Sequence, residues 1–294
     1  MTTADTSLPR PSSTVWPKIS SPFKAVAKLP PSATIGMAMI AVVTLGALFA
    51  PLLTSADPLA LSSETLRPPS WAHPMGTDDL GRDLFARVLY GGRVSLMVGV
   101  FSAVIGITLG MSFGMIAGFF GGRIDEVLMR VTEMFQIVPR LLVALVVVSM
   151  LGSGLLNVIM VIGFLSWPVT ARIVRARVLV VRQEEFMMAA RMSGASRTRM
   201  ILRHILPNVL PYFLVSGSLQ VASAVLSESF LSFLGLGDPT QPSWGLILQQ
   251  GQLYLQQAWW LTTFPGIALS MAILGLNLTG DGLGSSLKML GARK

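Results

Sequence analysis

Long runs of apolar residues, separated by short polar segments, make up most of the chain after about residue 33. A helix needs about 20 mostly apolar residues to cross a bilayer. The third and fourth runs are joined by only Gly152-Ser153-Gly154, which requires an antiparallel hairpin. The pattern therefore predicts an all-α polytopic membrane protein with six transmembrane helices. The predicted spans are 33–53, 94–120, 134–151, 155–171, 209–233 and 260–279.

Composition agrees with a membrane protein and excludes several kinds of chemistry. Of the residues, 52% are hydrophobic and 12% charged, whereas a soluble domain has about 25% charged residues. There is no cysteine, so disulfides and thiolate metal sites are excluded. His73 and His204 lie far apart, and no metal centre is expected. The net charge of +8 follows the predicted membrane sides, so we expect no nucleic-acid partner.

The lysines and arginines set the predicted orientation. Cytoplasmic loops of membrane proteins carry an excess of these residues. If the N-terminus lies inside, most of the 22 lysines and arginines also lie inside, and the 234–259 loop contains none. Both termini are therefore predicted to be cytoplasmic. The basic residues on the predicted outer side are Arg67, Arg82, Arg87 and Arg93.

Residues 1–32 are rich in proline, serine and threonine and mildly basic, which predicts a disordered cytoplasmic arm. A cleaved signal peptide is the alternative, because Thr54-Ser55-Ala56 follows an apolar run. That run is too long, and its leader too extended, for an ordinary signal sequence. Residues 33–294 would then form the transmembrane domain, with an outer loop at 54–93 and a cytoplasmic segment at 172–208.

The outer loop contains a predicted short helix. Thr77 can cap its start, with Asp78 and Asp79 in the first turn. Apolar residues recur every four positions from Leu80, and Gly91-Gly92 would end the helix. It would lie on the membrane beside the second span, or contribute to an outer gate or a partner contact. The acidic residues lack the alternating spacing of a calcium loop. The polar and glycine residues of this stretch are Gly76, Thr77, Asp78, Asp79, Gly81, Arg82 and Asp83.

The segment 172–208 has its own helix start, stop and restart. Glu184 and Glu185 open a helix, where acidic side chains suit the helix dipole. Ala189-Ala190 present a small surface that another protein can approach, and Gly194 ends the helix. Pro207 suits the first turn of the next span. This order favours a docking element over a solvated basic loop.

Three motifs in the same order resemble one family. Ala189-Ala190-x-x-x-Gly194, followed by Leu206-Pro207, resembles the EAA loop of bacterial ABC-importer permeases. The stretches 75–83 and 228–237 look like the C-type permease of the dipeptide/oligopeptide/nickel group. The resemblance covers nearly the whole chain from about residue 33.

The resemblance implies that the segment contains a coupling helix, which sits in a cleft of a separate ATPase subunit. Met188 stands where the motif has its glutamate. Glu184 and Glu185 lie about one turn earlier on the same helix, and the sequence leaves open whether either replaces it. The residues expected to couple to the ATPase are Glu184, Glu185, Ala189, Ala190, Arg191, Gly194, Leu206 and Pro207.

Polar groups inside spans are costly and mark candidate pathway residues. Arg140 follows Pro139, where a kink is expected, and Glu228 lies in the outer half of the fifth span. We favour pairing of Arg140 with Glu228 over contact with cargo. Glycines repeating every four residues in the second span predict close packing, within this subunit or against a second permease. Weaker candidates for the translocation path or gate are Gln136, Gln220 and Asn277.

The resemblance implies half of a translocation path for short peptides in the bacterial inner membrane. Nickel chelates or glutathione-like solutes are alternative cargoes. The chain lacks a Gly-x-x-x-x-Gly-Lys-Ser/Thr loop, so we expect no enzyme activity and no bound cofactor, with ATP and Mg²⁺ held by the partner. The implied partners are a homologous second permease, one or two ATPase subunits, an extracytoplasmic solute-binding protein and the lipid bilayer.

Two functions of other classes compete with this reading. An ion-coupled carrier would need membrane-embedded carboxylates and usually an internal repeat, and only Glu228 is a good candidate. An intramembrane enzyme would need a His-Glu-x-x-His or serine–histidine arrangement, which His73 and His204 do not provide.

Overall fold

The computed structural model describes residues 30–291, and for residues 211, 212, 214, 215 and 286–291 it describes the backbone only. Almost the whole predicted N-terminal arm lies outside the described residues. Within residues 30–291 the chain is helical, and the only β pairing is an isolated bridge between Thr77 and Asp83. The predicted all-α architecture is confirmed.

The first helices are α2 (Pro31–Leu48), α3 (Ala50–Leu53) and α4 (Leu84–Phe120). The next are α5 (Gly122–Ile137), α6 (Arg140–Leu151) and α7 (Leu155–Val181). Four of the described helices, α2, α4, α7 and α12, are long and apolar enough to cross a membrane, and the bent pair α5 and α6 makes a fifth. The chain is therefore a multi-pass membrane protein, while the count of six spans stays a prediction.

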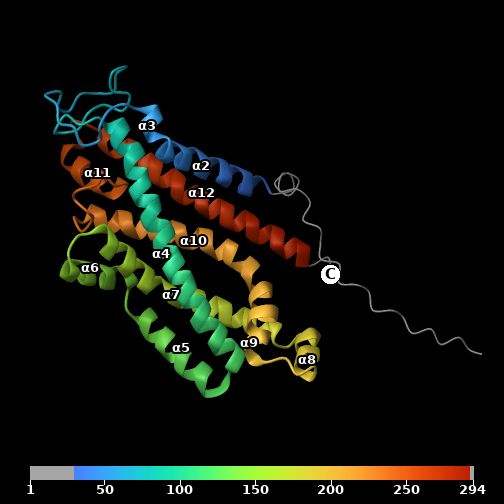
Figure 1. The fold of residues 1–294 in the computed structure, drawn as a ribbon. Coiled ribbons are helices and arrows are strands. Elements are labelled where there is room, and N and C mark those ends of the chain that lie inside the picture. The colour runs from blue at the N-terminus through green and yellow to red at the C-terminus, as the bar shows by residue number, and fades with distance from the viewer. Residues whose placement is uncertain (1–29, 292–294) are drawn as a thin grey trace, which may run out of the picture.

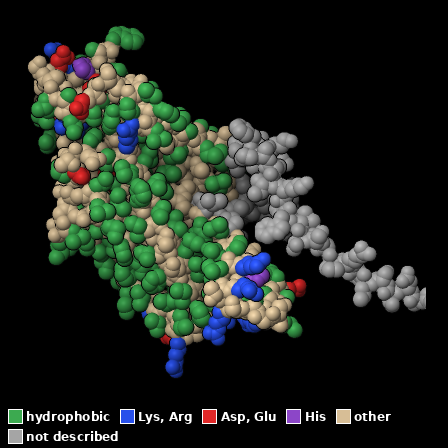
Figure 2. Space-filling model, in the orientation of Figure 1, with side chains coloured by type: hydrophobic (Ala, Val, Ile, Leu, Met, Phe, Trp, Pro, Cys, Tyr) green, Lys and Arg blue, Asp and Glu red, His purple; other side chains and the backbone are tan. Residues whose placement is uncertain are grey.

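The second half of the chain begins with α8 (Glu185–Met192), α9 (Arg197–Arg199) and the π-helix η1 (Met200–Ile205). These are followed by α10 (Leu206–Phe233), α11 (Trp244–Gly251), the short 3-10 helix η2 (Gln252–Tyr254) and α12 (Trp260–Gly291). Figure 1 places α8 and α9 at one end of the bundle, and α11 with the loop before α4 at the other. Figure 2 shows hydrophobic side chains covering most of the surface between these two polar ends.

Glycines hold α4 close to α7. Gly106, Gly110, Gly114 and Gly118 all face α7, and a methyl group added at Gly114 would lie 2.5 Å from the Ala171 carbonyl oxygen. The predicted small-residue face is thus used within this chain rather than against a second permease. Helices α2 and α12 approach each other in the same way, because the space beside Gly36 is filled by the backbone of Gly275 and Thr279.

The short helix predicted in the outer loop differs from the structure at both of its ends. No helix begins at Thr77: α4 begins at Leu84, where the Asp83 carboxylate accepts a hydrogen bond from the Ala86 amide (2.8 Å). Gly76 and Gly81 have φ of 80° and 73°, which turns the chain tightly before this cap. Gly91-Gly92 do not end the helix either, because they give room for Trp244 and Ser243 of the 234–259 region. The expected interfacial helix is instead the first part of the second span.

The third span is broken. Helices α5 and α6 meet at Val138-Pro139 with a bend of 80°. Proline has no amide proton and its ring excludes the carbonyl of the preceding turn, so a kink is expected here. The predicted kink is confirmed, but α5 begins at Gly122, well before the predicted start at residue 134.

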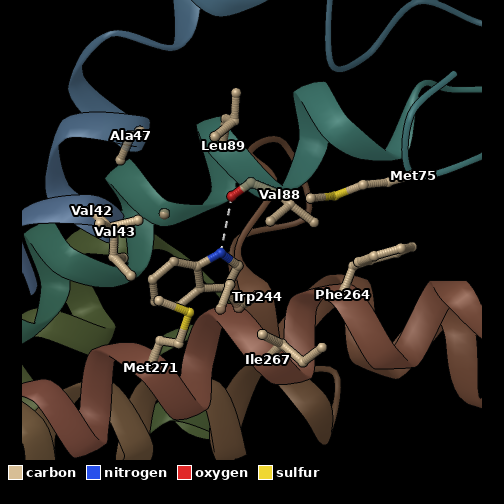
Figure 3. A pocket seen from close by; sticks show the side chains of 13 residues that line it. Val42, Val43, Ala47, Met75, Val88, Leu89, Trp244, Phe264, Ile267 and Met271 are labelled. Carbon is tan, nitrogen blue, oxygen red and sulfur yellow. Dashed lines mark hydrogen bonds between the residues drawn. The ribbon is translucent and has the colours of Figure 1, made fainter. Parts of the chain in front are cut away.

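Helix α11 returns into the bundle and fixes α10 and α12 to α4. The Trp244 indole is buried and donates a hydrogen bond from Nε1 to the Val88 carbonyl (2.9 Å), as Figure 3 shows. Beside it lies an apolar cavity of about 180 Å³, lined by side chains such as Val43, Phe264 and Met271. A buried hydrogen bond between helices far apart in sequence makes α11 part of the core.

We expect Gly114→Ala to destabilise the protein by about 1–3 kcal/mol, because the added methyl group must push α7 away from α4. The midpoint of thermal unfolding in detergent, followed by tryptophan fluorescence, measures the effect. Gly266→Ala in α12 is the matched control, since open space surrounds that position. Equal midpoints for the two variants would contradict the assigned packing.

Candidate functional site

The segment 182–208, here called the elbow, folds against the end of the bundle. Met187 of α8 is only 1% exposed and packs with Met200 and Ile205. Glu184 is the N-cap residue of α8, and its backbone is extended. Gly194 lies in the turn after α8, where its φ is 75°. The predicted start, stop and restart of the elbow are confirmed. Pro207 falls in the first turn of α10, which follows η1 without a gap.

Several large apolar side chains of α8 are exposed. Met188 is 64% and Met192 87% exposed, with Phe186 and Ala189 beside them. Exposed large apolar side chains grouped on one short helix indicate a contact surface. Of the predicted coupling residues, Glu184, Glu185, Ala189, Arg191 and Gly194 are exposed, and Ala190 and Leu206 are partly buried.

Three arginines surround a hollow between the elbow and the end of α4. Arg182, Arg191 and Arg197 line a space of about 560 Å³ together with Phe119 and Phe120. The Arg197 guanidinium lies 6.0 Å from the centroid of the Phe120 ring. The elbow therefore combines an apolar helix face with a strongly basic recess.

A salt bridge fixes α5 to α7 near the same end. Arg175 donates from Nε and Nη2 to the two Asp125 oxygens, at 2.5 and 2.7 Å. Bidentate pairs of this kind are stronger and more directional than single contacts. This pair could not be predicted, because Asp125 lies 50 residues before Arg175, beyond the reach of spacing arguments.

Arg140 and Glu228 do not pair with each other. Arg140 donates from Nη2 to the Ser223 hydroxyl (2.7 Å) and the Ser227 hydroxyl (3.2 Å). Glu228 is 2% exposed and accepts hydrogen bonds from Ser95 (2.9 Å) and Ser232 (2.7 Å). The predicted pairing is therefore wrong, because serine hydroxyls on α4 and α10 satisfy each charged group separately.

Arg140 borders a cavity of about 210 Å³ between α6, α7 and α10. Gln220 lines it too, accepting from Thr170 (2.7 Å) and donating to Ser166 (3.0 Å). Gln136 is partly buried, and its Nε2 has no partner among the described residues. Asn277 lies partly buried on α12, which does not line this cavity. The structure thus brings together Arg140 and Gln220 out of the five predicted path residues.

The loop before α4 is held by a buried polar cluster. Asp78 is 2% exposed and accepts from the Arg82 side chain (2.7 Å) and from Arg87. Gln250 of α11 accepts from the same two arginines, at 3.2 and 2.7 Å. The loop motif is thus structural: it fixes the 54–83 loop to α4 and α11. Sequence reasoning missed Arg87 and Gln250, because nothing in the sequence joins positions 163 residues apart.

Other residues of the motif form the turn itself. The Thr77 hydroxyl accepts from the Arg67 amide (2.9 Å), and the His73 Nδ1 lies 2.7 Å from an Asp83 oxygen. Asp79 is more exposed and lies 3.9 Å from Arg82. Among the described residues, no group of three or more acidic or histidine side chains could hold a metal ion.

The structure is a bundle of apolar helices with an exposed elbow at one end, and comparison with known proteins identifies the family. The chain belongs to the family "Binding-protein-dependent transport system inner membrane component", whose model matches residues 110–287. The matched part includes the elbow, the broken span and the cavity. Members are transport permeases rather than enzymes.

Curated relatives agree over most of the chain. The dipeptide transport system permease protein DppC of Alkalihalophilus pseudofirmus is 39% identical over 257 residues, covering 87% of this chain and 84% of the relative. The oligopeptide transport system permease protein OppC of Bacillus subtilis is 38% identical over 260 residues, with 87% and 84% covered. A putative peptide transport system permease protein of Brucella suis is 44% identical over 251 residues, with 85% and 84% covered.

A solved structure shows the same fold. The match is a structure of the MetNI methionine ABC transporter in an inward-facing conformation, with a TM-score of 0.53 and 16% identity. It covers 67% of this chain and 94% of that chain.

We expect Asp78→Asn to lower the free energy of unfolding by about 3 kcal/mol, because it leaves Arg87 buried without its counter-charge. Thermal unfolding in detergent measures the loss. Asp79→Asn, one residue along and 27% exposed at its side chain, should cost less than about 1 kcal/mol. A similar loss in both variants would mean that burial of the cluster does not matter.

Proposed function

We propose that this chain is the permease subunit of an ATP-binding-cassette importer for short peptides and forms half of its translocation path. The observation that carries the proposal is the elbow: a short helix anchored by one buried methionine, which presents Phe186, Met188, Ala189 and Met192 to solvent. An exposed apolar helix at the end of a membrane bundle suits a groove in a partner. The peptide cargo rests on relatives named for dipeptide and oligopeptide transport.

The proposal requires other subunits. A second, homologous permease would complete the path, and one or two ATPase subunits would hold ATP and Mg²⁺ against α8. A solute-binding protein on the outer side would deliver the cargo. The chain would have six spans if the bent pair α5 and α6 counts as one span and α10 is added to the other four. An even number of spans would place both termini on the same side, in the cytoplasm of a bacterium. The basic side chains around the elbow agree with that orientation.

Coupling would be mechanical. Closure of the ATPase dimer would displace α8, which packs on η1 through Met187. The π-helix η1 would pass the displacement to α10, because α9, η1 and α10 follow one another without a break. Met188, at the glutamate position of the motif, would contact the ATPase through apolar packing. Glu184 and Glu185, also exposed, could then contribute only through charge.

Reconstituted transport tests the function. The four kinds of subunit, in proteoliposomes with the loaded binding protein outside, should accumulate a labelled dipeptide when ATP is inside. Accumulation should persist when the proton gradient is collapsed, and stop when the ATPase cannot hydrolyse ATP. The opposite pattern would identify an ion-coupled carrier, and uptake of a nickel chelate or glutathione but not of peptides would change the cargo.

Ala189→Trp should reduce ATP-driven uptake at least tenfold, because the large ring prevents close approach of a partner to the exposed face of α8. Uptake and co-purification of the ATPase are both measured. Ala189→Ser keeps the small volume and should transport like the unmodified protein. Normal uptake by Ala189→Trp would contradict the coupling role of α8.

A further inference from the structure

Arg140 is a cation in a membrane-embedded position without a counter-charge. It begins α6 at the break of the third span, and the described residues include no Asp or Glu in ion-pair distance of it. The enclosed Arg82 and Arg87 differ, since both bind Asp78. The partly exposed Arg175 also has a counter-charge, Asp125. A charge in the membrane is costly unless it is paired or faces a wet cavity.

Its hydrogen-bonding capacity is only partly used. Arg140 binds Ser223 and Ser227 through Nη2 alone. The Nε and Nη1 groups make no hydrogen bond with a described residue, and neither is among the buried polar atoms that lack a partner. Neither group is therefore fully enclosed by the described residues, and Arg140 lines the cavity.

Among the described residues the cavity carries no negative charge, and the hydroxyl protons of Ser166 and Thr170 are already donated to Gly163 and Gln220. Its described lining contains hydroxyl and amide groups of Ser166, Thr170, Gln220 and Ser223 among apolar side chains, and no acidic residue. Ser223 accepts from Arg140, so its own hydroxyl proton can be donated to a ligand. One guanidinium with a neighbouring hydroxyl donor suits a carboxylate, and an ammonium group would be repelled.

We propose that Arg140 and the Ser223 hydroxyl bind the C-terminal carboxylate of the peptide as it passes between α6, α7 and α10. This inference rests on the proposed peptide transport and names the chemical group that the path recognises. A volume of about 210 Å³ accommodates the end of a peptide rather than the whole of it. The site thus binds only one terminus of the peptide during its passage, and it tolerates varied side chains.

The test compares dialanine with dialanine amide in the assembled transporter in proteoliposomes. Maximal uptake rates are measured with saturating loaded binding protein, and the ratio of acid to amide is compared between variants. The unchanged binding protein contributes equally to every ratio, so a change in the ratio reports on the permease. Arg140→Gln should lower the ratio about tenfold, mainly through slower uptake of the acid.

Two further variants sharpen the result. Arg140→Lys keeps the charge but loses the planar group, and its ratio should lie between those of the unmodified protein and Arg140→Gln. Arg130→Gln removes an arginine that is 70% exposed at its side chain on α5, and should leave the ratio unchanged.

An unchanged ratio in Arg140→Gln would overturn the inference while peptide transport stands. Failure of both Arg140 variants to assemble with the second permease would also overturn it, because the arginine would then be paired with a carboxylate of that subunit. If the unmodified transporter carries neither dipeptide, the proposed function itself fails, and that result is distinguishable from the other two.

Discussion

The close packing of α4 on α7 is the constraint on which the rest of the structure depends. Four glycines spaced one turn apart, from Gly106 to Gly118, let the two helices meet at backbone distance. In lipid there is little hydrophobic drive between helices, so such van der Waals packing supplies much of the association. The pair forms a rigid frame, against which α10 places Gln220 and Glu228 and to which Arg175 attaches α5.

The two polar ends of the bundle are built on different principles. At the loop end, the charged groups are buried and paired. Asp78 binds both Arg82 and Arg87, so these side chains present little charge to a partner. At the elbow end, charges and apolar side chains alike are exposed, as Met192 and Arg191 show. Buried ionic groups contribute specificity of structure more readily than net stability. Grouped exposed apolar side chains, in contrast, indicate a surface that binds a partner.

Much of the fold could be predicted from periodicity and length, because a span must be long and apolar. The kink at Pro139 and the turn at Gly194 also followed from local chemistry. Pairing could not be predicted: Ser223 and Ser227, on the same helix as Glu228, take up the hydrogen bonds of Arg140. The start of α4 was missed because Thr77 and Asp83 are equally good caps, and only the contacts of the loop with α11 select Asp83.

The uninterrupted helical path from Arg197 to Phe233 has a consequence for the whole machine. This stretch, formed by α9, η1 and α10, carries the last part of the elbow, the hydroxyls of Ser223 and Ser227, and the buried Glu228. If the elbow couples to an ATPase as proposed, a rotation of this stretch would turn these hydroxyls relative to Arg140, which belongs to a different helix. Release of a carboxylate bound at the proposed site and opening of the route beyond it would then be a single motion.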